Sequence, residues 1–277
     1  MVRHRHDGDR PGRTRSANDV SEKRNDMLML KDYTPPECFD PWVGSQYKGN
    51  GLWNRKVLVV GESHYDEWRE KGKDQCWQRS TTKHKLLRTF TQECVQDVVN
   101  GNGGAPYWPA VRNRLGGEEY EKQSPDVFWN KVAFYNFIQS PVPGCPPKAR
   151  PTQAQWEAAP ALLKQTITRL RPDRILFTGK STGPRKSLWN YVPCRNGKLP
   201  DIEVDGVSLP LEFFTLKDGK RVYVTATAHP RSNLFIRALT PALKEFVVGT
   251  WEHSAAAVSC PGVKIEPEGD SSKMASG

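Results

Sequence analysis

Short apolar runs, each closed by a turn that contains glycine or polar residues, recur along the middle of this chain. Such runs are typical of buried strands. Those predicted are at residues 56–60, 132–138 and 174–179. Two further strands, at 212–216 and 221–227, flank an Asp-Gly pair at 218–219, which predicts a hairpin.

The stretches between these strands have the spacing of helices that bury one face. Residues 83–99 place their apolar side chains on one broad face. Residues 152–170 begin with Thr152 and Gln155, which form the sequence pattern of a capping box. A last helix opens at Thr240, which precedes a proline. Strands that alternate with helices indicate an α/β sheet with parallel members.

The length and composition favour one domain with polar ends. The chain has 277 residues, which suits a single large core with tails. Because both ends are poor in apolar residues, we expect a disordered basic arm at 1–30, an α/β domain at 31–253 and a disordered tail at 254–277. No apolar run is long enough to cross a membrane, and the polar start resembles no secretory signal. We therefore expect a protein that is not secreted and not bound to a membrane, cytoplasmic in a bacterial or phage-like context, or nuclear.

The charge balance points to an acidic partner. Basic residues number 41 and acidic residues 31, so the formal net charge is +10, which favours binding to a polyanion such as nucleic acid. The six cysteines contain no CxxC pair, which argues against a zinc ribbon or an iron–sulfur motif. We therefore predict no metal site and no cofactor.

Polar residues follow the predicted strands directly. In sheets with parallel strands, ligands bind beyond the carboxyl ends of the strands, so these residues are the candidates for a site. They are residues 61–66, Asn136 with Gln139, residues 179–181 and residues 229–232.

The Gly-Lys-Ser sequence at 179–181 imitates the end of a phosphate-binding loop. Such a loop needs a glycine five residues before Gly179, and that position is Arg174, inside a predicted strand. The sequence therefore argues against nucleotide hydrolysis. A short helix predicted at 181–191 can still offer its first N–H groups to a DNA phosphate, with Lys180 and Ser181 beside it.

The order of these segments resembles the uracil-DNA glycosylase superfamily, over about residues 50–250. The family's first motif, a strand followed by Gly-polar-polar-Pro-Tyr or Gly-Glu-Ala-Pro-Gly, is similar to VVGESHY at 59–65. The middle of the chain resembles the thermophilic-type branches, where a strand ending in Asn, a proline-rich loop, RPT with a helix, and RP with a strand ending in Gly follow one another. The family's final His-Pro-Ser motif resembles AHPRS at 228–232, which has one inserted residue.

This resemblance implies a single three-layer α/β/α domain around a central, mostly parallel four-stranded sheet. It also implies a monomeric, monofunctional DNA glycosylase that binds double- or single-stranded DNA. Such an enzyme flips a damaged or modified pyrimidine out of the DNA, hydrolyses its N-glycosidic bond and leaves an abasic site.

The resemblance assigns three groups of residues, by their part in the reaction. The catalytic group has His229 as donor to the leaving base and Glu62 as water activator or cation stabiliser, with Asp66 as the next carboxylate. In the base-binding group, Asn136 reads the Watson–Crick edge, Tyr65 forms a wall near C5, and Trp77 stacks on the flipped base; Ser63 and His64 complete it. The DNA-binding group consists of Lys180, Ser181, Arg231, Ser232, Asn233 and Leu234, the last four following His229 into the minor groove.

The sequence also departs from the family pattern. Ser63 stands where the best-known branch has its water-activating Asp, and His64 replaces the proline of that turn. The cysteines that hold an iron–sulfur cluster in the thermophilic branches are missing. These changes favour a base other than uracil, such as a modified pyrimidine of foreign DNA, and hence a role in phage defence.

Each candidate also has a structural interpretation. His229 could be a capped loop histidine, Asn136 could bond only to turn backbone, and Tyr65 and Trp77 could fill the core. Two other functions stay open. Ser63 favours a catalytically inactive relative that binds DNA and reads damaged or modified bases, and the third alternative is an α/β enzyme that acts on a small molecule with His229 and Glu62.

Overall fold

The computed structural model describes residues 38–65, 67–69, 76–78, 88–102, 105–142, 149–179, 197–230, 232 and 237–251. Contacts between Cα atoms divide the chain into two compact units, Met1–Pro35 and Pro36–Gly277, and every described residue belongs to the second. The predicted arm at 1–30 and tail at 254–277 lie outside the described residues, so the predicted domain limits stay a prediction.

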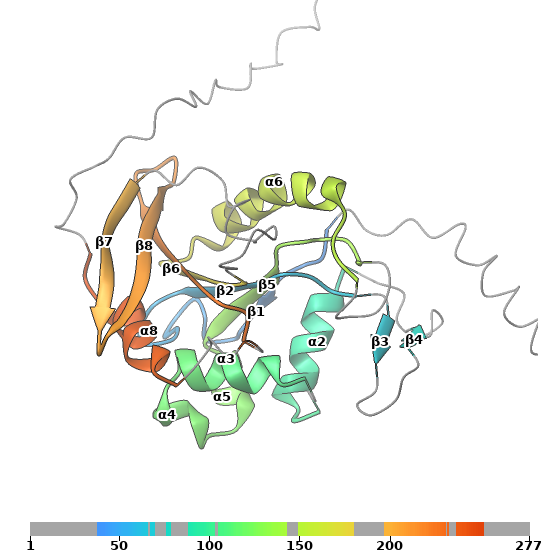
Figure 1. The fold of residues 1–277 in the computed structure, drawn as a ribbon, viewed down its shortest axis with the longest axis horizontal. Coiled ribbons are helices and arrows are strands. Elements are labelled where there is room, and N and C mark those ends of the chain that lie inside the picture. The colour runs from blue at the N-terminus through green and yellow to red at the C-terminus, as the bar shows by residue number, and fades with distance from the viewer. Residues whose placement is uncertain are drawn as a thin grey trace, which may run out of the picture. The chain divides into compact units, whose positions relative to one another are not determined.

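The centre of the fold is a seven-stranded mixed sheet with the order β1-β5-β2-β6-β9-β8-β7 (Figure 1). Four neighbouring strands, β5, β2, β6 and β9, are parallel to one another. The outer strands β1, β8 and β7 pair antiparallel. The bounds are β1 Trp42–Val43, β2 Val57–Gly61, β5 Val132–Asn136, β6 Arg174–Thr178, β7 Gly197–Val204, β8 Val207–Thr215 and β9 Arg221–Thr227. A separate pair, β3 Glu67–Arg69 and β4 Cys76–Gln78, is antiparallel.

The α/β class is therefore confirmed, but the predicted number of four strands is wrong for this sheet. The additional strands are β1, β7 and β8, and of these only β8 was predicted in part. The turn between β7 and β8 is Asp205-Gly206, and both residues have positive φ, at 50° and 75°. Such Asp-Gly turns are the commonest connection of tight hairpins. The Asp205-Gly206 pair was thus a sequence signal for the hairpin of β7 and β8, which the apolar pattern alone did not predict.

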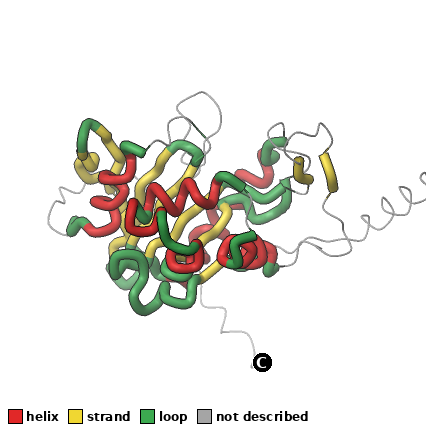
Figure 2. Tube along the Cα trace, turned by 90° about the horizontal axis from the view of Figure 1, so that it is seen from below, coloured by secondary structure: helices red, strands yellow, loops and turns green. Residues whose placement is uncertain are grey.

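Helices cover both faces of the sheet (Figure 1), and the view from below shows helices lying over the strands (Figure 2). One face carries α6, Gln153–Leu170, whose capping box between Thr152 and Gln155 is confirmed. The other face carries α2 Phe90–Val99, α3 Tyr107–Leu115, α4 Glu118–Glu121, α5 Pro125–Trp129 and α8 Leu239–Val248. Among the described residues, no helix has the length and apolar content that a membrane crossing requires. The predicted helix at 181–191 lies outside them.

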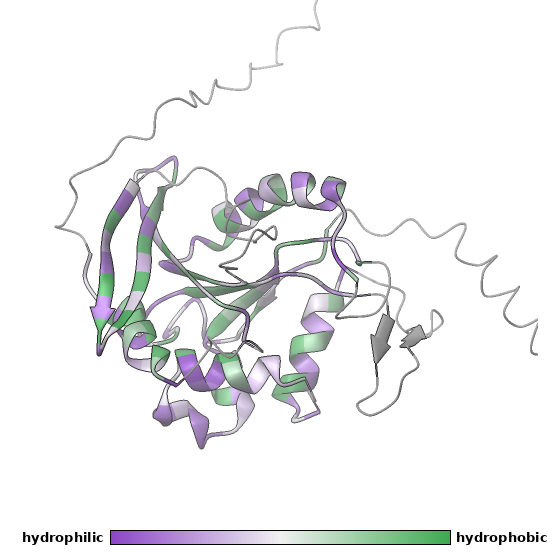
Figure 3. Ribbon diagram, viewed as in Figure 1, coloured by the Kyte–Doolittle hydropathy of each residue, from purple (hydrophilic) through white to green (hydrophobic). Residues whose placement is uncertain are grey.

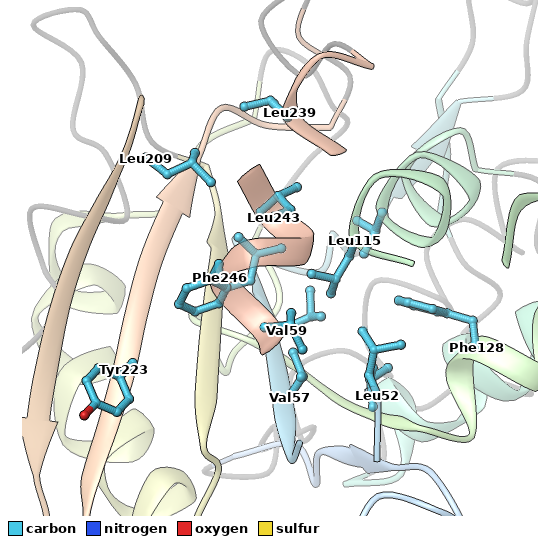
Figure 4. Close-up of a cluster of buried hydrophobic side chains, with 14 of the residues drawn as sticks. Leu52, Val57, Val59, Leu115, Phe128, Leu209, Tyr223, Leu239, Leu243 and Phe246 are labelled. Carbon is cyan, nitrogen blue, oxygen red and sulfur yellow. The ribbon is translucent and has the colours of Figure 1, made fainter. Parts of the chain in front are cut away.

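Alternate residues of each central strand supply two separate cores. Val57 and Val59 of β2 pack toward α3 and α8, whereas Leu58 and Val60 pack toward α6. Figure 4 shows the first of these clusters, and Figure 3 shows how hydrophobic and hydrophilic residues alternate along α6, as expected for a helix with one face on a sheet. Because both faces are covered, all five residues of β2 are buried.

A buried arginine joins the sheet to the end of α8. Arg174, the first residue of β6, donates from Nε to the carbonyl of Phe246 at 2.9 Å and from Nη2 to the carbonyl of Gly249 at 2.6 Å. Its guanidinium lies 4.8 Å from the ring centroid of Tyr223. Phe246 lies in the last turn of α8, and Gly249 is the C-cap residue that follows it. Carbonyls at a helix C-terminus lack intrahelical donors, so Arg174 stabilises that end.

Candidate functional site

The carboxyl ends of the four parallel strands form one polar row. Gly61 of β2 pairs in register with Asn136 of β5. The register of β2 with β6 ends at the pair Val60 and Phe177, and the next residue of β6, Thr178, pairs with Thr227 of β9. The residues two positions earlier on β5, β2 and β6 all belong to the core under α3 and α8. Because strand side chains alternate with a period of two, the row faces the same side as that core.

Gly61 is the point of closest approach in this row. A methyl group at this position would overlap the Asn136 Oδ1 atom and would lie 3.2 Å from the Tyr107 Oη atom. Glycine is therefore required so that the amide and the phenol can meet over the end of β2. Asn136 is buried, and its side-chain amide makes no hydrogen bond to the residues that the structure describes. That amide is free to bind a ligand, while Gln139 Nε2 donates to the Asn136 backbone carbonyl.

Tyr107, the first residue of α3, was not predicted from the sequence and lies at the centre of the site. Its hydroxyl is 2.9 Å from Thr178 Oγ1, and its ring centroid is 5.7 Å from that of His229, with 48° between the ring planes. Burial raises the pKa of Tyr107 above its usual value, so the hydroxyl stays protonated. Thr178 was equally available in the sequence as a polar residue at a strand end, whereas nothing local distinguishes Tyr107.

His229 comes two residues after β9 and is partly buried. Its carbonyl accepts the N–H of Ser232 at 2.7 Å, which closes a turn over the intervening Pro230. Proline suits the second position of such a turn because its φ is already restrained. The turn holds the His229 backbone at the carboxyl end of β9, beside Tyr107.

Glu62 is the carboxylate of the site. It follows Gly61 directly, and its carbonyl accepts the Ile138 N–H at 2.9 Å, so the loops after β2 and β5 continue side by side. Burial raises the pKa of Glu62 above the usual value, and the positive charge of Arg150 acts in the opposite direction. A carboxylate with a raised pKa is a stronger base, which suits proton abstraction from water.

The loop after Glu62 is anchored by His64. The His64 Nε2 atom lies 2.9 Å from Thr91 Oγ1, and the ring packs edge-on against Phe90 and Phe39, with centroids 4.8 and 5.5 Å away. This buried position accounts for His64 as a loop anchor; contact with a base stays a prediction.

Ser63 and Tyr65, on either side of His64 in the chain, are held differently. Tyr65 forms a β-bridge with Val142, so it follows the loop after β5. Ser63 has a buried hydroxyl with no hydrogen-bond partner among the described residues.

Asn136 and His229 thus both lie near Tyr107, at the ends of two strands, and Glu62 follows Gly61 directly at the end of a third. That the three side chains act together stays a prediction. Of the other predicted residues, Ser232 donates its backbone N–H to the His229 carbonyl, and Ser63, His64 and Tyr65 follow Glu62 in the same loop. Trp77 lies in β4 opposite Trp68 of β3, and its side chain is outside the description. The remaining predicted site residues also lie outside the described residues: Asp66, Lys180, Ser181, Arg231, Asn233 and Leu234.

Other candidate sites are not supported by the described part of the chain. It contains no group of three or more His, Cys, Asp or Glu side chains that could hold a metal ion. Surface cavities of about 480 and 150 Å³ are lined by none of the site residues. No protein-family model and no curated protein matches this sequence. The chemistry of the strand ends is therefore the basis for a functional conclusion.

Proposed function

We propose that this protein is a DNA glycosylase of the uracil-DNA glycosylase type, which hydrolyses the N-glycosidic bond of a flipped pyrimidine and leaves an abasic site. The observation that carries the proposal is the row of strand ends: Gly61 and Asn136 are in register, and Tyr107, which lies over Gly61, also packs on His229. The motifs that suggested the family are far apart in the sequence, and their meeting at one edge of the sheet supports it.

The reaction separates a sugar that becomes positive from a base that leaves with negative charge. His229 donates a hydrogen bond to the departing base, where negative charge develops in the transition state. The free amide of Asn136 binds the edge of the base, which gives selectivity. Glu62 accepts a proton from the attacking water, or stabilises the sugar cation, and its raised pKa increases its basicity.

The sheet adds support to this family. Its four parallel strands form an uninterrupted block, with helices on both faces, as the proposed three-layer domain requires. The antiparallel strands β1, β8 and β7 then extend that block at its two edges. The architecture around the site is thus compatible with a glycosylase in which the base enters at the carboxyl ends of the strands.

DNA is the proposed partner because of charge. An excess of 10 positive charges favours a polyanion, and DNA affinity should fall steeply as salt rises because counterions are released. We propose a monomer that acts on a modified pyrimidine, with defence against foreign DNA as one role.

A second candidate, a catalytically inactive relative that reads bases without cleaving them, is favoured by one observation. Ser63 stands where the best-known branch has its water-activating carboxylate, and its hydroxyl is buried without a described partner. A serine there cannot take a proton from water as a carboxylate does. Under this alternative Glu62 does not replace the missing group.

The test is a panel of labelled oligonucleotides that carry uracil, a thymine mispair, hydroxymethylcytosine or glucosylated cytosine, treated with alkali after incubation. Alkali-sensitive breaks that disappear in Glu62→Gln, but not in the control Glu93→Gln on α2, support a glycosylase. Salt-sensitive binding without breaks supports the inactive relative. If the protein neither binds nor breaks any of these oligonucleotides, both DNA functions are overturned, and the enzyme acting on a small molecule is the alternative that stays open.

A further inference from the structure

The hydroxyl of Tyr107 ends a hydrogen-bond chain that starts on the backbone of β2. Thr178 Oγ1 lies 3.0 Å from the carbonyl oxygen of Val60 and 2.9 Å from Tyr107 Oη. A carbonyl can only accept, so the single hydroxyl proton of Thr178 is donated to Val60. Tyr107 must therefore be the donor to Thr178. The chain has one direction and anchors the phenol to the middle of the sheet.

This anchor fixes the plane of the Tyr107 ring as well as its hydroxyl. The ring packs against Trp108 at 5.1 Å and Phe134 at 6.0 Å between centroids, both close to edge-on. Its remaining described aromatic neighbour is His229 at 5.7 Å. The imidazole therefore meets a surface whose position is set by strands β2 and β6.

We infer that Tyr107 is a positioning residue that holds the imidazole of His229 at the carboxyl end of β9. The turn closed by Ser232 fixes the backbone of His229, and χ1 and χ2 depend on what the imidazole packs against. The ring of Tyr107 is such a contact, 5.7 Å away between centroids. This inference rests on the proposed function only in that His229 acts on a substrate; the restraint itself exists in the free protein.

The restraint is measurable without DNA, by NMR of the imidazole C–H groups. The chain has six histidines, so the His229 signals are assigned by their loss in His229→Asn. We expect these signals to shift in Tyr107→Leu, which removes the ring current, and to shift in Tyr107→Phe and Thr178→Val, which release the ring. Thr178→Ser keeps the hydroxyl and should restore the wild-type position.

Thr225→Val is the matched control for Thr178→Val. Thr225 is a buried threonine of the neighbouring parallel strand, and it also donates to a backbone carbonyl, that of Pro210 at 2.7 Å. It should leave the His229 signals unchanged. Signals that do not move in Tyr107→Leu, or that move equally in Thr178→Val and Thr225→Val, would overturn the inference.

Catalysis provides the second measurement. Tyr107→Phe and Thr178→Val should each slow single-turnover base release about tenfold at unchanged DNA affinity, because a small displacement of a catalytic group is costly. The double variant should be no slower than either single variant, since both break the same chain. Additive losses, or a loss in DNA affinity alone, would contradict a positioning role. If the wild type releases no base, the proposed function fails while the NMR result still decides the inference.

Discussion

Replacing Gly61 with alanine tests the geometry of the site most directly. The added methyl group would overlap Asn136 Oδ1 and lie 3.1 Å from Phe134 Cζ and 3.2 Å from Tyr107 Oη. Gly61 is not among the glycines with positive φ, so its backbone accepts alanine and the contacts alone set the cost. Because β2 is paired on both sides, the neighbouring side chains must move rather than the strand.

The expected loss of stability can be worked out from these contacts. Overpacking of this kind costs about 1–3 kcal/mol. Displacing Tyr107 breaks its hydrogen bond to Thr178, which adds about 1 kcal/mol, and the stiffer unfolded chain returns roughly 0.5 kcal/mol. The net loss of about 1.5–3.5 kcal/mol should lower the melting temperature by roughly 3–14 °C. Base release should also fall sharply, since the amide that reads the base is displaced.

The assay is thermal unfolding followed by circular dichroism, alongside base release. Gly49→Ala is the matched control, because a Cβ atom at Gly49 meets no heavy atom within 4 Å. In the double variant Gly61→Ala/Asn136→Ala the overlap disappears, so part of the stability should return while activity does not. If Gly61→Ala has the same melting temperature as the Gly49→Ala control, the close approach of Asn136 to β2 is refuted.

Three further outcomes follow from the site and its supports. His229→Ala should slow cleavage about 10²–10³-fold with little loss of DNA binding. Asn136→Ala should slow cleavage and also reduce discrimination between bases. If His229→Ala cleaves at the wild-type rate in the oligonucleotide assay, His229 is a structural loop residue. Burial raises the pKa of Glu62 and Arg150 opposes this rise, so Arg150→Gln should move the acidic limb of the pH–rate profile to higher pH, and a shift to lower pH would contradict it. Arg174→Met should lower the free energy of unfolding by about 3 kcal/mol in urea titrations, because two helix-end carbonyls lose a charged donor, and an unchanged midpoint would refute that role.

The local sequence was sufficient for the central strands and for the cap of α6. The prediction that Thr240 caps the last helix was wrong: α8 begins at Leu239, its N-cap is Ala238, and no side chain caps it. Continuous apolar runs and the capping pair Thr152 and Gln155 are patterns of residues close together in the chain. They can therefore be recognised from the sequence alone. The same reasoning located Gly61, Asn136 and His229 at strand ends. It could not predict the number of strands in the sheet, because β1 is two residues long and β7 contains Gly197 and Pro200, which are weak strand formers.

The sequence by itself determined which residue types stand at the ends of the parallel strands, because strand period and turn residues are local properties. Only the tertiary structure decided their roles. His64 turned out to be a loop anchor, since Phe39 and Phe90 enclose it from distant parts of the chain. Tyr107 became the centre of the site because α3 packs over the ends of β2 and β6, and that contact spans 71 residues between Tyr107 and Thr178. Burial and register join residues that no sequence window contains.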